Sequence, residues 1–423
     1  MSNRRILLCL NHLGGEELKY VLKAFEDNWI VPMGPDVDAF EHDLEAFANH
    51  RAVGEPLDKR VVALCNGTSA VQLALIGCGV KPGDEVVAQS FTFCASVNPI
   101  MYLGAKPVLV DSEPDSWNMD PELLDHAIAD RIAVAGRKPR AIMAVHLYGM
   151  PARIDEILAV GRKYDIPVIE DAAEAMGSNF DGQRCGTFGR YGVLSFNGNK
   201  MITTSGGGAL ITPDDAERRH MMFYATQARE SYPYYQHEEL GYNFRLSNVC
   251  AAIGRGQMAI IDEHLAHHRH AQDMYRELLA DIPGVRLHEN PSARYDANFW
   301  LCTITLDDEV RVRGREKAYQ AVITGAVGGA AGVTHCASSP HTAVEPRADV
   351  EALRLALAEA GIESRPLWKP MHCQPLYADA PRYVNGVSED LFSRGLCLPA
   401  GPWVTDDDLR YIADHIRQAI ISI

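Results

Sequence analysis

The sequence has no long apolar run of the kind that crosses a membrane. The most membrane-like stretch, Ala321–Val333, is rich in glycine and alanine and is too short to span a bilayer. Near the N-terminus, the apolar run Ile6–Leu10 is far shorter than the core of a signal peptide. We therefore expect a cytoplasmic protein without a membrane partner.

Positive charge is scarce. The 423 residues include 40 lysines and arginines against 56 acids, which gives a formal net charge of −16. An acidic chain binds polyanions poorly, so we expect no nucleic-acid partner. A small anionic substrate stays compatible with this charge if a few cations gather in one cleft.

Paired cysteines are also missing. The ten cysteines are scattered, none forms a CxxC pair, and several lie inside apolar runs. This pattern favours reduced cysteines that pack in the interior, and it argues against a disulfide scaffold or a zinc site. We expect no metal.

Three catalytic signatures are absent as well. No GxGxxG follows an early strand, which disfavours a dinucleotide-dependent dehydrogenase. The sequence has no GxxxxGK[ST] and no GxSxG, which argues against a P-loop enzyme and an α/β-hydrolase.

Short apolar runs that alternate with helical stretches are present in the middle of the chain. Strands and helices in alternation predict a doubly wound, mostly parallel α/β sheet. The runs lie at 61–64, 86–88, 108–110, 141–145, 168–169, 193–196 and 209–211.

The flanking regions complete the predicted organisation. We expect an N-terminal segment with a substrate-cleft turn at 1–35, a large domain at 36–255 and a smaller α+β domain at 256–423. Within them, apolar residues have helical spacing at 18–25 and 37–47. The smaller domain has a candidate helix at 260–279, a strand near 300–304, a helix at 350–360 and a mobile loop near 311–347.

Lys200 lies between two of the apolar runs. Its polar loop begins after Ser195 and ends in the glycines 206–208. A lysine held in such a loop is partly desolvated, which favours the neutral amine, and a neutral amine can form a Schiff base with a carbonyl. A surface lysine in a hairpin is the alternative for this loop taken alone.

Chemically useful residues follow the other runs, where open α/β sheets bind ligands. The segment 66–70 offers a glycine, hydroxyls and a helix N-terminus for a phosphate, or only a helix cap by Thr68 or Ser69. Asp171 could hold the proton on a pyridine nitrogen, or cap a helix. His146 could support Asp171 or the ring, or be a core histidine, and the aromatic pair at 91–93 is either a stacking face or core.

Together these features predict pyridoxal phosphate (PLP). A phosphate cup, an acid for a ring nitrogen, an aromatic face and a Schiff-base lysine are the groups that this cofactor requires.

The same segments resemble those of the DegT-type sugar aminotransferases, which are PLP enzymes of fold type I. The similarity continues through 241–248 and 365–372 and spans nearly the whole chain. Most of that family has glutamine where this chain has Glu174. Glu174 and the loop Asn197–Lys200 before 203–208 are most similar to the bacillosamine-type branch.

The resemblance implies a role for each matching residue. Lys200 would carry the cofactor and move the proton, and Asp171 would bind the ring nitrogen. The other implied cofactor contacts are Phe93 and Ala173 on the two ring faces, Gly67, Thr68 and Ser195 at the phosphate, Glu174 at the ring hydroxyl, and Asn243 from a neighbouring subunit. A site that borrows Asn243 requires a homodimer.

The resemblance also implies a reaction. L-glutamate would donate its amino group to a UDP-linked 4-keto-6-deoxy-N-acetylhexosamine, giving a 4-amino-4,6-dideoxy nucleotide sugar for surface glycan or glycoprotein synthesis. Since the diphosphate needs cations, the substrate candidates are Arg245, Arg365 and Lys369, with Trp29 nearby and His372 at the sugar; each could instead be a surface residue or ion pair.

Three alternatives stay open. The first is an aminotransferase for a dTDP- or GDP-linked 3- or 4-keto sugar. The second is a PLP sugar dehydratase or isomerase, although the dehydratase branch lacks the lysine found at Lys200. The third is a non-catalytic regulator, against which the intact lysine, acid and phosphate cup argue.

Overall fold

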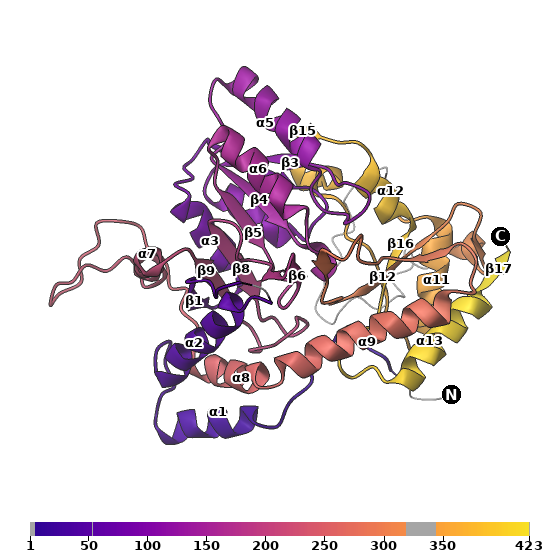
Figure 1. Ribbon diagram of the computed structural model, residues 1–423, viewed down its shortest axis with the longest axis horizontal. Coiled ribbons are helices and arrows are strands. Elements are labelled where there is room, and N and C mark those ends of the chain that lie inside the picture. The colour runs from indigo at the N-terminus through magenta and orange to yellow at the C-terminus, as the bar shows by residue number, and fades with distance from the viewer. Residues whose placement is uncertain (1–4, 53, 319–343, 423) are drawn as a thin grey trace.

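An eight-stranded sheet forms the centre of the larger part of the molecule (Figure 1). The computed structural model describes residues 5–52, 54–318 and 344–422. All seven predicted apolar runs are strands of this sheet. In sheet order the strands are β1 (Arg60–Leu64), β9 (Gly208–Thr212), β8 (Tyr191–Ser195), β5 (Val168–Asp171), β4 (Ala141–Val145), β2 (Glu85–Gln89), β3 (Lys106–Val110) and β15 (Arg382–Tyr383).

Strand direction places the ends of these strands at one edge. Strands β8, β5, β4, β2, β3 and β15 are parallel, whereas β9 is antiparallel to both of its neighbours, β1 and β8. Strand β1 therefore runs in the same direction as β8. The residues that follow β1, β2, β4, β5 and β8, and those that precede β9, consequently share the edge at which α/β sheets bind ligands.

Helices cover both faces of the sheet because its strands are apolar on both sides. Side chains alternate along β2: Val86 and Ala88 pack with helices α3 and α7, while Val87 packs with α5 and α6. The helices of this part are α1 (Glu17–Glu26), α2 (Pro35–Asn49), α3 (Gly67–Gly77), α4 (Asn98–Tyr102), α5 (Pro121–Ala135), α6 (Ile154–Tyr164), α7 (Asp215–Ala225) and α8 (Asn248–Met258).

A four-stranded antiparallel sheet forms the smaller domain, and the long helix α9 runs from the larger part to it (Figure 1). The predicted helices at 260–279 and 350–360 are confirmed as α9 and α11, and the predicted strand near 300–304 begins at Cys302. The elements are α9 (Ile261–Leu279), β10 (Val285–Leu287), β12 (Cys302–Leu306), α11 (Ala348–Glu359), β14 (Arg365–Pro366), α12 (Val387–Arg394), β16 (Gly395–Leu398) and α13 (Asp406–Ala419).

Short strands complete the structure. Strands β6 (Asn179–Phe180), β7 (Gln183–Arg184) and β11 (Tyr295–Asp296) form a three-stranded sheet, and β13 (Arg311–Val312) pairs with β17 (Ile420–Ser422). Residues 319–343, most of the predicted mobile loop, lie outside the described residues. No helix in the described ranges is long and apolar enough to span a bilayer.

Two segments cross the predicted domain boundaries. Ile6, from the predicted N-terminal segment, pairs with Ile362 and packs in the core of the smaller domain. Strand β15, from the predicted smaller domain, extends the large sheet beside β3. Each of these contacts involves only one or two residues. A segment this short has no periodic pattern, so the sequence could not predict either contact.

Candidate active site

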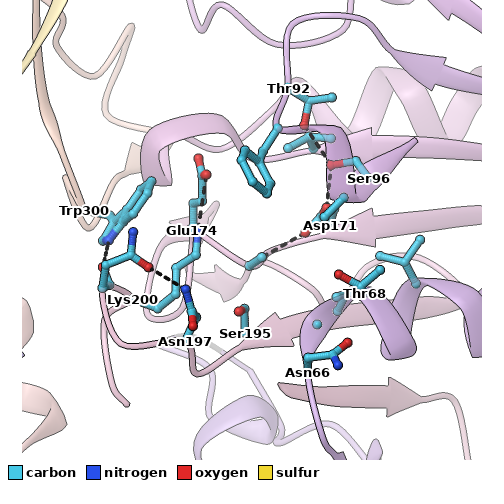
Figure 2. A pocket seen from close by; sticks show the side chains of 18 of the residues that line it. Asn66, Thr68, Thr92, Ser96, Asp171, Glu174, Ser195, Asn197, Lys200 and Trp300 are labelled. Carbon is cyan, nitrogen blue, oxygen red and sulfur yellow. Dashed lines mark hydrogen bonds and ion pairs between the residues drawn. The ribbon is translucent and has the colours of Figure 1, made fainter. Parts of the chain in front are cut away.

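A cavity of about 320 Å³ opens at the edge of the sheet where the strand ends meet (Figure 2). All predicted cofactor residues except Asn243 line it: Gly67, Thr68, Phe93, Asp171, Ala173, Glu174, Ser195 and Lys200. Residues far apart in the sequence, such as Gly67, Asp171 and Lys200, thus converge on one space, as the common direction of the strands requires.

The N-terminus of α3 forms one end of the cavity. Asn66 caps the helix by accepting a hydrogen bond from the Ser69 amide at 2.8 Å, so the cap is neither Thr68 nor Ser69. A Cβ on Gly67 would come within 3.2 Å of the Ser195 Cβ, which shows how closely the helix approaches the end of β8. Free amides at a helix start, beside Thr68 and Ser195, make a cradle that fits a phosphate.

Asp171 ends β5 and is held by two hydrogen bonds. The Ser96 hydroxyl donates to Oδ2 at 2.7 Å, and the Ala173 amide donates to Oδ1 at 3.1 Å. Since the Ser96 proton points at Asp171, the Thr92 hydroxyl, 2.8 Å away, donates to Ser96 in turn (Figure 2). The carboxylate is 6% exposed and its direction is fixed, as a partner for a ring nitrogen must be.

Lys200 reaches into the cavity from the loop between β8 and β9. Its Nζ lies 3.3 Å from Oε1 of Glu174 and 3.9 Å from the ring centre of Trp300. Oε2 of Glu174 accepts the Tyr148 amide at 2.8 Å. The predicted lysine in a tight loop between buried strands is therefore confirmed, and its amine is held between a carboxylate and an aromatic face.

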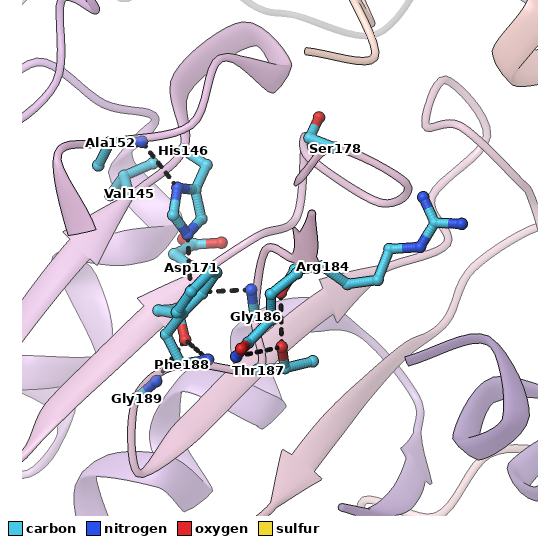
Figure 3. Close-up of polar contacts among 12 residues, drawn as sticks. Val145, His146, Ala152, Asp171, Ser178, Arg184, Gly186, Thr187, Phe188 and Gly189 are labelled. Atoms are coloured by element: carbon cyan, nitrogen blue, oxygen red, sulfur yellow. Dashed lines mark hydrogen bonds and ion pairs between the residues drawn. The ribbon is translucent and has the colours of Figure 1, made fainter. Parts of the chain in front are cut away.

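The side chain of His146 contacts the residue before Asp171 and not the Asp171 carboxylate (Figure 3). Its Nδ1 accepts the Ala152 amide at 3.0 Å, so its proton is on Nε2, which donates to Glu170 at 3.0 Å. The fully buried Glu170 also accepts three backbone amides, from Gly186, Phe188 and Gly189. Of the two uses predicted for His146, that of a satisfied core histidine is the one observed.

None of the five predicted substrate residues lines this cavity. Arg245 is paired with Glu41, and both side chains are only 9% exposed. The guanidinium also donates to the Ala63 carbonyl at 3.1 Å. A cation buried in a structural pair is costly to redirect toward a ligand, so we do not assign Arg245 to the substrate.

The other substrate candidates have local partners. Arg365 pairs with Glu363 at 2.9 Å, and Lys369 donates to the Val344 carbonyl at 2.9 Å. His372 lies between Ser90, at 2.6 Å, and Glu389, at 3.0 Å. Trp29 is 40% exposed, and Asn243 is exposed and accepts a hydrogen bond from Gln227.

Two tryptophans in the cavity wall were missed by the sequence analysis. Trp300 and Trp368 come from the smaller domain, and Trp368 lies 6.0 Å from Phe93 between ring centres. The Trp368 amide donates to the Tyr148 hydroxyl at 2.7 Å, which links the two domains beside the cavity. Trp368 stands in a segment that the family resemblance includes, but no local pattern indicates where either ring points.

Comparisons with known proteins agree with this site. The profile of the DegT/DnrJ/EryC1/StrS aminotransferase family matches residues 11–331 and 333–417. The EpsN protein of Bacillus subtilis is 42% identical over 410 residues, which are 96% of this chain and 93% of that protein. GDP-perosamine synthase of Caulobacter vibrioides is 34% identical over 419 residues, 99% of each. A solved aminotransferase of this family from Brucella abortus has a TM-score of 0.79 at 28% identity, with 95% of both chains covered.

The fold and the site define a PLP-dependent aminotransferase of fold type I. The chain belongs to the DegT/DnrJ/EryC1/StrS aminotransferase family. The donor set fits the cofactor at each point: a helix start for the phosphate, Asp171 for the ring nitrogen, Phe93 and Ala173 beside the ring, and Lys200 for the aldehyde carbon.

Proposed function

We propose that this protein transfers the amino group of L-glutamate to a UDP-linked 4-keto-6-deoxy-N-acetylhexosamine. The product is a 4-amino-4,6-dideoxy nucleotide sugar. Glu174 and the loop Asn197–Lys200, the two features that resemble the bacillosamine-type branch, support this choice. The main support for the proposal is that both features line the same cavity, where Oε1 of Glu174 lies 3.3 Å from Lys200 Nζ.

Different residues of the cavity have different roles in amino transfer. Bound PLP supplies the electron sink for amino transfer. Lys200 Nζ, inside the cavity, takes a proton from the substrate carbon and hands it on. Asp171, directed by Ser96, keeps a proton on the ring nitrogen. Phe93 and Trp368 form an aromatic wall beside the place of the cofactor ring.

A GDP-linked 4-keto sugar is the second candidate substrate. It is supported by the 34% identity to a GDP-perosamine synthase over 99% of both chains. Trp29, Arg365, Lys369 and His372 stay predicted substrate contacts, since the nucleotide binds beyond the reacting carbon and outside the cavity that Lys200 lines.

An absorbance experiment tests the substrate. L-glutamate is expected to bleach the visible band of the lysine-bound cofactor, and UDP-4-keto-6-deoxy-N-acetylglucosamine is expected to restore it within the same sample. The dTDP- and GDP-linked 4-keto sugars serve as matched controls. Recovery with GDP-4-keto-6-deoxymannose alone would replace the UDP substrate by the second candidate, and no bleaching with glutamate would reject the donor.

We also propose that two copies of the chain share their active sites. Leu18, Leu22 and Phe25 form an exposed apolar row on α1, each more than half exposed, on the face turned away from α8. The segment between α7 and α8, which contains Asn243, extends away from the body (Figure 1) and exposes Tyr235 at 79%. An uncovered apolar face and a projecting arm both favour a symmetric partner of the same sequence.

Sedimentation tests this homodimer. The wild-type chain is expected to sediment at twice its 46.6 kDa mass. Phe25→Glu should shift it toward the monomer, because a charge placed inside an apolar interface is left unpaired. Val134→Glu, at an apolar position on α5 that is more exposed than Phe25, should keep the dimer. A wild-type monomer at micromolar concentration would end the proposal.

A further inference from the structure

Trp300 contacts both Lys200 and the residue that precedes it. The face of its indole ring lies 3.9 Å from Lys200 Nζ, and its indole N–H donates to the carbonyl of Asn199, the preceding residue, at 2.6 Å. The side chain is almost fully buried, and Figure 2 shows it directly beside Lys200 and Glu174. One ring therefore touches both the amine and the loop that carries it.

The backbone just before Trp300 is strained. Phe299 has a φ of +50°, in the left-handed region that bulky residues seldom occupy. Strain of this kind persists only where surrounding contacts enforce it, and it is typical of functional sites. Here it turns the chain so that Trp300 leaves the line of β12 and faces the cavity.

Asn298 supplies the enforcing contacts. This fully buried side chain accepts the Trp300 amide at 2.8 Å. Its NH₂ group donates to the carbonyls of Glu174, at 2.9 Å, and Met176, at 3.0 Å. A single amide thus ties Trp300 to the turn that carries Glu174, so the two groups that contact the Lys200 amine are held as a unit.

Two kinds of group that attract an ammonium ion lie against the amine. An aromatic face and a carboxylate both attract an ammonium ion, and they do so more strongly where water is excluded. The Cys9 thiol is the other titratable neighbour: burial raises its pKa to about 12, against the opposing effect of the Lys200 charge, so it stays neutral. Among the described residues, Glu174 is therefore the charged side chain in contact with the amine.

We propose that Trp300 is a positioning residue for Lys200. Its ring, together with Glu174, holds the ammonium that forms when Nζ accepts a proton from the substrate carbon. The same proton is then handed on, and Nζ returns to the neutral amine. The proposal rests on the role of Lys200 in amino transfer and is independent of which sugar is the acceptor.

The test measures how firmly the Lys200 amine is held in the cofactor-free protein. Acetic anhydride acylates lysine side chains, and mass spectrometry of the Lys200 and Lys163 peptides gives both rates in one sample. Lys163 is an exposed lysine on α6, so the ratio of the Lys200 rate to the Lys163 rate corrects for the reagent. In Trp300→Leu this ratio is expected to rise about tenfold, because the ring no longer covers and holds the amine.

Two further variants make the outcome decisive. Trp403 also donates its indole N–H to a backbone carbonyl, that of Asn11 at 2.8 Å, but does not line the cavity. Trp403→Leu should leave the Lys200 ratio unchanged. Trp300→Phe keeps a weaker aromatic face and should raise the ratio about threefold. This variant tests the proposal if Trp300→Leu does not fold.

A second measurement separates positioning from general damage. In the glutamate half-reaction of the PLP-loaded enzyme, deuterium at the glutamate α-carbon should slow Trp300→Leu more than it slows the wild type, because proton transfer to a misplaced amine limits the rate. A ratio within twofold of the wild type in both Trp300 variants would overturn the proposal. Since neither assay contains a sugar, a wrong sugar assignment cannot produce that result.

Discussion

Replacement of Lys200 by arginine is expected to lower the rate of amino transfer by at least about 10³-fold. Arginine keeps a cation beside Glu174 and over Trp300, so the charge of the cavity is unchanged. It cannot give up its proton at neutral pH, and so can neither bond to the cofactor aldehyde nor accept a proton from the substrate. The measurement is 2-oxoglutarate formed from L-glutamate in a single turnover of PLP-loaded protein.

The absorbance spectrum gives an independent reading of the same variant. Lys200→Arg should bind PLP without the visible band of the lysine-bound cofactor. Lys163→Arg is the matched control, because Lys163 is exposed on α6, forms an ion pair with Asp125 on α5 at 2.7 Å, and does not line the cavity. It should keep both the band and the wild-type rate. More than a tenth of the wild-type rate in Lys200→Arg would contradict the role given to Lys200.

The cofactor side of this site could be predicted because it depends on strand ends alone. Each of its residues that line the cavity lies in a short segment that follows or precedes an apolar run, and parallel strands bring their ends to one edge whatever the order of the strands. Lys200, Asp171 and Thr68 therefore meet even though the sequence gives no strand order. The antiparallel direction of β9, which the sequence does not state, is what places the start of that strand at the same edge.

The nucleotide side could not be predicted in the same way. Whether a cation is free depends on partners that are distant in the sequence. Arg245 pairs with Glu41, which lies 204 residues earlier, and no local pattern records this pair. In a chain with a formal net charge of −16, most cations have an acid within reach, so a cation near a motif is weak evidence for a ligand contact.

The two tryptophans of the cavity could not be predicted for a different reason. The positions of Trp300 and Trp368 depend on how the smaller domain docks on the large sheet, and on a left-handed Phe299 that no propensity predicts. The strain at Phe299 and the buried amide of Asn298 are visible only in three dimensions. A functional residue of this type is found through its contacts and not through its spacing.

Replacement of Asp171 by asparagine is expected to lower the rate of amino transfer by about 10²- to 10³-fold, the cost of removing one preorganised electrostatic partner. Asparagine accepts the Ser96 hydroxyl as before but carries no charge, so the ring nitrogen loses its proton and PLP becomes a weaker electron sink. The single-turnover glutamate assay and the position of the cofactor band measure this change.

The neighbouring Glu170 provides the control, since it accepts hydrogen bonds from three backbone amides and from His146 and does not line the cavity. Glu170→Gln should lower the melting temperature while the rate per folded enzyme stays within a few-fold of the wild type, because an amide cannot satisfy all of those donors. An Asp171→Asn rate equal to that of Glu170→Gln would show that the charge of Asp171 does not serve the cofactor.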